Sequence, residues 1–238
     1  MPLPYRTACD GGPETPPSGE ERMAKTNREP SAPAQEPLIL LIPGLDGSGP
    51  GHWQRRWAEE IDNAQMVDLG LWEKPHRNTW INRLNHSVQR AGRPVVLVAH
   101  SLGCLLTAWW AKFEQPGFYS PVVGALLVAP PEVDFFPRDD RLNGFAPTPS
   151  DALPFPSILV ASRNDPWIGF PTARLLARQW GSEFVDAGET GHINADSKLG
   201  SWEDGKRLLR RLSGAAIPPE NLACPVPGEW PEGLEQRS

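Results

Sequence analysis

Cysteine is scarce in this chain. Three cysteines occur among 238 residues, at Cys9, Cys104 and Cys224. Their number is odd and their spacing forms no pair, so the sequence predicts neither a disulfide framework nor a zinc site. Cys104 falls in a segment with a helical pattern, where we expect it to be a small core residue.

Positive charge is also in short supply. The formal net charge is −6, and the sequence offers no basic face, which argues against a general nucleic-acid binder. The densest basic run, residues 206–211, is flanked by leucines at helical spacing. We therefore interpret this run as the solvated face of a helix.

Long apolar runs are lacking as well. No run approaches the length of a membrane span, and the polar, proline-rich N-terminus contains no apolar segment typical of a secretion signal. We therefore expect a soluble protein of the reducing cytoplasm that binds neither membrane nor nucleic acid. The sequence indicates no metal or other cofactor, and it does not identify a protein partner.

Proline, by contrast, is abundant, with 28 residues. Residues 1–36 are rich in Pro, Gly, Glu and Ser without a hydrophobic period, and we expect a disordered leader there. Residues 213–238 are again rich in Pro and Glu, which predicts a mostly irregular tail. Residues 37–212 between them form one domain that is long enough for a sizeable core.

Short apolar runs alternate with helical patterns in this domain. Strands are expected at residues 38–42, 65–69, 95–99, 122–129, 157–161 and 183–186. Helices are expected at residues 53–61, 79–90, 102–114, 169–180 and 202–212. The pattern predicts a three-layer α/β fold with a mostly parallel sheet of about six strands and helices on both faces. In such a fold the site lies beyond the carboxyl ends of the strands.

Ser101 lies just after the third expected strand, and a helical segment follows it directly. This pattern is typical of a nucleophile elbow, a tight turn that lifts a serine out of the sheet. Such a turn needs small residues two positions before and after the serine, and here they are Ala99 and Gly103. The hydroxyl of Ser101 is therefore a candidate nucleophile if a base lies near it.

A glycine-rich loop, residues 43–51, follows the first expected strand. We interpret it as one half of an oxyanion hole, in which the backbone amide of Leu45 acts together with that of Leu102. The alternative is a plain strand-to-helix turn in which the glycines relieve strain. A phosphate-binding loop is disfavoured because the sequence has no GK[ST] signature.

Two further loops supply a carboxylate and an imidazole. Asp165 follows the fifth expected strand and His192 follows the sixth, which gives the chain order Ser, Asp, His that accompanies a nucleophile elbow. Asp165 is alternatively the N-cap of the next helix, and Asp134, after the fourth strand, is an alternative acid. His52, near the glycine-rich loop, is a possible substrate contact.

At this point the sequence resembles a known family. The motifs that carry the likeness are Val98-Ala-His-Ser-Leu-Gly-Cys104, Ala161-Ser-Arg-Asn-Asp-Pro166, Gly191-His-Ile-Asn-Ala-Asp-Ser197, and Pro43-Gly-Leu with Gly51-His-Trp-Gln54. They resemble the small α/β-hydrolases of the retinoblastoma-binding-protein-nine and YdeN-like serine hydrolase family, over residues 38–212. The resemblance implies a compact fold with a small lid or none, and a triad that falls on Ser101, Asp165 and His192.

We therefore expect a serine hydrolase that cleaves carboxylic esters of small or medium acyl groups through an acyl-enzyme on Ser101. An amidase or acyltransferase using the same triad is an alternative, as is a catalytically inactive interaction module with this fold. Phe135, Phe136 and Phe145 lie in the long segment between the fourth and fifth strands. They either line an acyl pocket or pack that segment onto the sheet.

Overall fold

The computed structural model describes residues 35–117 and 120–214. The predicted leader and tail lie almost wholly outside the described residues, so the predicted domain boundaries remain predictions. Cys9 and Cys224 also lie outside the described residues. No helix in the described part of the chain is both long and apolar enough to cross a membrane. The cytoplasmic location remains a prediction.

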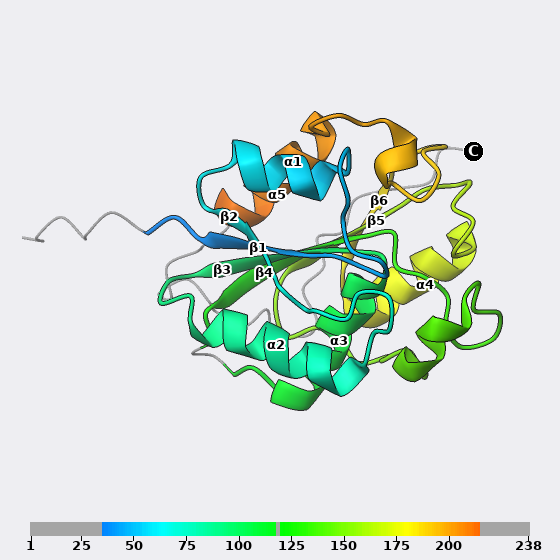
Figure 1. The fold of residues 1–238 in the computed structure, drawn as a ribbon, viewed down its shortest axis with the longest axis horizontal. Helices are drawn as coiled ribbons and strands as arrows, with labels where there is room; N and C mark the ends of the chain where they lie inside the picture. The colour runs from blue at the N-terminus through cyan, green and yellow to red at the C-terminus, as the bar shows by residue number, and fades with distance from the viewer. Residues whose placement is uncertain (1–34, 118–119, 215–238) are drawn as a thin grey trace, which may run out of the picture. The chain divides into compact units, whose positions relative to one another are not determined.

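A six-stranded sheet forms the centre of the fold (Figure 1). Its strands are β1 (Leu38–Ile42), β2 (Ala64–Met66), β3 (Val95–His100), β4 (Val122–Val128), β5 (Ser157–Ala161) and β6 (Glu183–Asp186). They are paired in the order β2-β1-β3-β4-β5-β6, and every pair is parallel. The carboxyl ends of all six strands therefore lie at one edge, where the predicted site residues follow β3, β5 and β6.

Among the described residues, five α-helices cover this sheet on both faces (Figure 1). They are α1 (Trp53–Glu60), α2 (Arg77–Gln89), α3 (Leu102–Glu114), α4 (Phe170–Trp180) and α5 (Glu203–Gly214). Helices α1 and α5 pack on one face, whereas α2, α3 and α4 pack on the other. This arrangement is the predicted three-layer α/β fold.

Each face of the sheet contributes to its own hydrophobic core. Because successive side chains of a strand point to opposite faces, Leu40 and Ile42 pack against α2 and α3, whereas Ile39 and Leu41 pack towards α1 and α5. Burial on both faces explains why the four inner strands, β1, β3, β4 and β5, are largely continuous apolar runs rather than alternating ones.

The structure differs from the expected elements at a few places. The second strand ends at Met66, although it was expected to continue through residue 69. Val67 and Leu69, which belong to the same apolar run, are buried in the core beyond the end of the strand, where the Val67 N–H still donates to the Leu41 carbonyl oxygen at 2.9 Å. Two short 3₁₀ turns, η1 (Asp140–Phe145) and η2 (Ala195–Ser197), were not anticipated.

Candidate active site

Ser101 occupies a sharp turn between β3 and α3. Its backbone is held at φ 53° and ψ −125°, a region that non-glycine residues rarely adopt and that marks local strain. The neighbouring Gly103 needs to be a glycine, because a Cβ there would lie 2.5 Å from the carbonyl oxygen of Ile42. The strand-to-helix turn predicted from the sequence is present.

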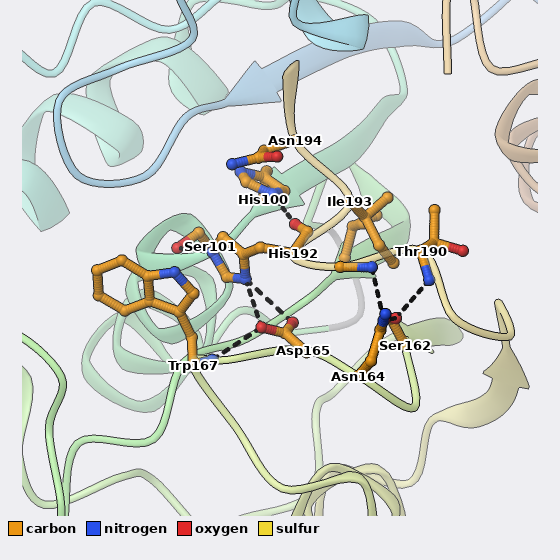
Figure 2. Close-up of polar contacts among 12 residues, drawn as sticks. His100, Ser101, Ser162, Asn164, Asp165, Trp167, Thr190, His192, Ile193 and Asn194 are labelled. Atoms are coloured by element: carbon orange, nitrogen blue, oxygen red, sulfur yellow. Dashed lines mark hydrogen bonds and ion pairs between the residues drawn. The ribbon is translucent and has the colours of Figure 1, made fainter. Parts of the chain in front are cut away.

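His192 joins Ser101 to Asp165 (Figure 2). Its Nε2 lies 2.9 Å from Ser101 Oγ, and its Nδ1 lies 2.9 Å and 3.0 Å from the two carboxylate oxygens of Asp165. A carboxylate can only accept, so Nδ1 carries the proton and the lone pair on Nε2 accepts from the serine hydroxyl. The three predicted residues therefore come together in an arrangement that can move a proton from the serine to the imidazole.

The carboxylate of Asp165 is buried and fixed by its own turn. Its side chain is fully excluded from solvent, and its Oδ1 also accepts from the backbone N–H of Trp167 at 2.9 Å. The N-cap of α4 is Gly169, so the alternative role of Asp165 as a helix cap is wrong. Asp134, the alternative acid, instead accepts from the backbone N–H of Thr148 at 2.8 Å.

The backbone of residues 190–194, which we call the histidine loop, is held by side chains from the turn after β5. Ser162 Oγ accepts from the Thr190 N–H at 2.8 Å, and Asn164 Oδ1 accepts from the Gly191 N–H at 2.7 Å. The same turn thus positions both the carboxylate and the imidazole that it meets. Sequence reasoning missed Ser162 and Asn164, because small polar residues are ordinary in loops.

The glycine-rich loop packs directly on the elbow. A Cβ at Gly44 would lie 2.8 Å from Ser101 Cβ and 3.0 Å from the backbone nitrogen of Leu102. Gly44 is therefore in close contact with the backbone amide of Leu102, one of the two predicted oxyanion donors. Leu45, whose amide is the other predicted donor, directly follows Gly44 in the chain.

Gln54 ties this region to the sheet. Its Nε2 donates to the carbonyl oxygens of Ile42 at 3.2 Å and Val98 at 3.0 Å, and its Oε1 accepts from Ser48 Oγ at 2.6 Å. One side chain at the start of α1 thereby binds the end of β1, the middle of β3 and part of the glycine-rich loop.

Two further imidazoles lie near His192. Burial, followed by the influence of His192, lowers the pKa of His52 from 6.5 to about 4, and burial lowers the pKa of His100 well below its ordinary value. Both rings are therefore neutral at neutral pH. His52 is 4% exposed, and its Nδ1 accepts from the Gln54 N–H at 3.2 Å, so it caps α1. Its role as a substrate contact remains a prediction.

The aromatic residues of the β4–β5 connection fall into two groups. Phe145 is fully buried and packs against Trp80, whereas Phe135 and Phe136 are 80% and 88% exposed. Phe145 therefore packs the connection onto the core. Trp167, in the turn after β5, lies beside the His192 ring with 5.3 Å between ring centroids (Figure 2).

Cys104 is a buried core residue, as expected. Burial raises the pKa of its thiol above the ordinary value. Within the described ranges, no group of three or more His, Cys, Asp or Glu side chains is arranged to hold a metal ion.

Comparison with protein families gives one match over most of the chain. A family model described as serine hydrolase matches residues 39–211. None of the curated proteins with which the sequence was compared matches it.

Solved structures of similar fold include two YdeN-like proteins. A putative YdeN-like hydrolase from Pectobacterium atrosepticum is 30% identical, with a TM-score of 0.67, over 77% of this chain and 94% of that one. The ydeN gene product of Bacillus subtilis is 18% identical, with a TM-score of 0.56, over 73% and 97%. Est1E from Butyrivibrio proteoclasticus, solved with ferulic acid bound, is 14% identical, with a TM-score of 0.56, over 74% and 89%. The first two likenesses confirm the predicted YdeN-like resemblance.

Proposed function

Because this chain belongs to the serine hydrolase family, we propose that it hydrolyses carboxylic esters of small or medium acyl groups through an acyl-enzyme on Ser101. The observation that carries this proposal is the continuous hydrogen-bonded path from Ser101 Oγ through His192 to the Asp165 carboxylate. A nucleophile, a base and a group that orients the base are the parts that covalent acyl transfer needs.

In the first half of the reaction, His192 Nε2 takes the proton of Ser101 as Oγ attacks the ester carbonyl. The new C–O bond places negative charge on the carbonyl oxygen, which accepts hydrogen bonds from the backbone amides of Leu45 and Leu102. Asp165 stabilises the imidazolium without taking its proton. Collapse of the intermediate breaks the bond to the alcohol, which leaves with the proton from His192.

In the second half, water attacks the acyl group on Ser101 while His192 acts again as the base. The acid is released and the proton returns to Ser101. Ser101 and His192 are each 8% exposed, so both reacting residues are largely shielded from solvent. Proteins of similar fold include one described as a thermophilic esterase, which fits an ester substrate.

The test is turnover of a series of p-nitrophenyl esters of increasing acyl length, beside aminoacyl amides, by the wild-type protein and Ser101→Ala. We expect hydrolysis of the shorter esters, loss of that activity in the variant, and labelling of the wild type by a fluorophosphonate probe. Absence of both turnover and labelling would favour the inactive interaction module. Faster turnover of the amides would identify the amidase alternative.

A further inference from the structure

Two neighbouring carbonyl groups of the histidine loop are bound by side chains from outside it. His100 Nε2 donates to the carbonyl oxygen of His192 at 2.9 Å, and Trp53 Nε1 donates to that of Ile193 at 2.8 Å. His100 is the last residue of β3, next to Ser101, and Trp53 is the first residue of α1. Two separate elements therefore hold adjacent peptide groups of one loop.

The backbone between these contacts is strained. Ile193 has φ 49°, which is unusual for any residue with a Cβ and more so for a β-branched one. Its side chain is completely buried. Strained backbone persists only where the surrounding structure over-determines it, and the hydrogen bonds from His100 and Trp53 are contacts that do so.

The reaction geometry depends on this backbone. His192 must meet the Ser101 hydroxyl with one ring nitrogen and the Asp165 carboxylate with the other, and both contacts are 2.9 Å at their shortest. A small shift of the His192 backbone would lengthen at least one of them.

We propose that His100 and Trp53 are positioning residues, which hold the strained backbone of residues 192–193 so that the His192 imidazole engages Ser101 and Asp165 at once. The kinetic part of this inference rests on the proposed function. The structural part, that these two side chains fix the loop, does not.

The protonation of His100 suits this role. A carbonyl oxygen only accepts, so Nε2 of His100 carries a proton. The His100 ring lies between two other imidazoles, 4.6 Å from the His52 ring and 5.0 Å from the His192 ring. Burial keeps the pKa of His100 low, so the side chain donates as a neutral group and does not oppose a positive charge on His192.

The experiment compares two substitutions of His100. His100→Phe keeps a planar ring but loses the donor, whereas His100→Gln keeps an N–H donor on a side chain of similar reach. We expect His100→Phe to lower kcat by about 100-fold, the loss associated with a misplacement of roughly 1 Å, with KM changed less than about twofold. His100→Gln should recover most of the lost kcat.

Trp53→Phe tests the second contact, and the chain offers a matched control. Trp180 is also fully buried, and its Nε1 donates to the carbonyl oxygen of Pro149 at 2.7 Å, outside the site. Trp180→Phe removes the same indole donor from the core. We expect Trp53→Phe to lower kcat and Trp180→Phe to leave it close to the wild-type value.

Amide hydrogen exchange of a peptide covering the histidine loop gives a readout that needs no activity. We expect faster exchange there in His100→Phe and Trp53→Phe than in His100→Gln and Trp180→Phe.

Wild-type kcat and wild-type loop exchange in His100→Phe would overturn the inference, as would equal losses of kcat in His100→Phe and His100→Gln. If Trp53→Phe does not fold, the His100 pair decides. If the wild-type protein neither turns over esters nor reacts with the probe, the proposed function fails and the exchange measurement alone decides.

Discussion

His192 Nε2 lies 2.9 Å from Ser101 Oγ, although the two residues are 91 positions apart in the sequence. The serine follows β3 and the histidine follows β6, and two strands, β4 and β5, lie between these in the sheet. The histidine loop therefore has to reach back across the carboxyl edge of the sheet. Its hydrogen bonds to the turn after β5, to His100 and to Trp53 hold it there.

Asp165→Asn should lower kcat for ester hydrolysis by a factor on the order of 10³–10⁴, because an amide that donates to Nδ1 leaves His192 in the wrong tautomer. Oδ1 of the asparagine can still accept from the Trp167 N–H, so we expect the thermal midpoint to change little. The measurement is steady-state kinetics on a short p-nitrophenyl ester beside thermal unfolding. Near-wild-type kcat in a folded variant would show that Asp165 does not orient the base.

Gly44→Ala should impair both stability and activity. The added Cβ would approach Ser101 Cβ to 2.8 Å and the Leu102 nitrogen to 3.0 Å, and relief of such overpacking costs about 1–3 kcal/mol. Gly49→Ala is the matched control, because a Cβ there meets nothing within 4 Å. Urea unfolding and kcat measure the two effects. Equal behaviour of the two variants would contradict the close packing of the glycine-rich loop on the elbow.

The stability of the protein should fall as the pH is lowered from about 6.5 to about 4. Burial lowers the pKa of His52 from 6.5 to about 4, so within this window the unfolded chain binds a proton that the folded chain does not. One such group contributes about 1.4 kcal/mol of unfolding free energy per pH unit, lost as the pH falls. His100, whose pKa is also lowered by burial, acts in the same direction.

His52→Asn isolates the contribution of His52. Asparagine is a good N-cap, so the variant keeps an acceptor for the start of α1 and loses the titrating group. Urea unfolding at several pH values should give a shallower dependence for the variant, by roughly one proton between about pH 4 and pH 6.5. The same slope in both proteins would show that His52 is not held neutral in the folded state.

Most of the fold follows from its sequence pattern, and the differences have local causes. The second helix was expected to begin at Thr79, but it begins at Arg77, because the His76 side chain accepts from the Thr79 N–H and caps it. Histidine is not among the usual N-cap residues, so the sequence gives no signal for this start. The second strand was expected to continue through residue 69, but it ends at Met66. Val67 and Leu69 are apolar because they are buried in the core, and this burial does not require them to be part of the strand.

The three residues of the proposed triad were predictable as neighbours because each follows the carboxyl end of a strand of a parallel sheet. The side chains that hold the histidine loop were not. The residues that His100 and Trp53 bind lie 92 and 140 positions away, and the acceptors are backbone carbonyl groups, which every residue has. From the sequence alone, His100 is only the elbow residue before Ser101, and Trp53 is only an aromatic residue of the core.

The most direct test of the central claim is to trap the acyl group. The wild-type protein is mixed with p-nitrophenyl butyrate, quenched in acid before turnover is complete, and analysed by intact-mass and peptide-mass measurement. The account predicts one butyryl group on the peptide that contains Ser101, none on Ser101→Ala, and much slower accumulation on His192→Ala. Undiminished ester turnover by Ser101→Ala, or a butyryl group on a different residue, would contradict it.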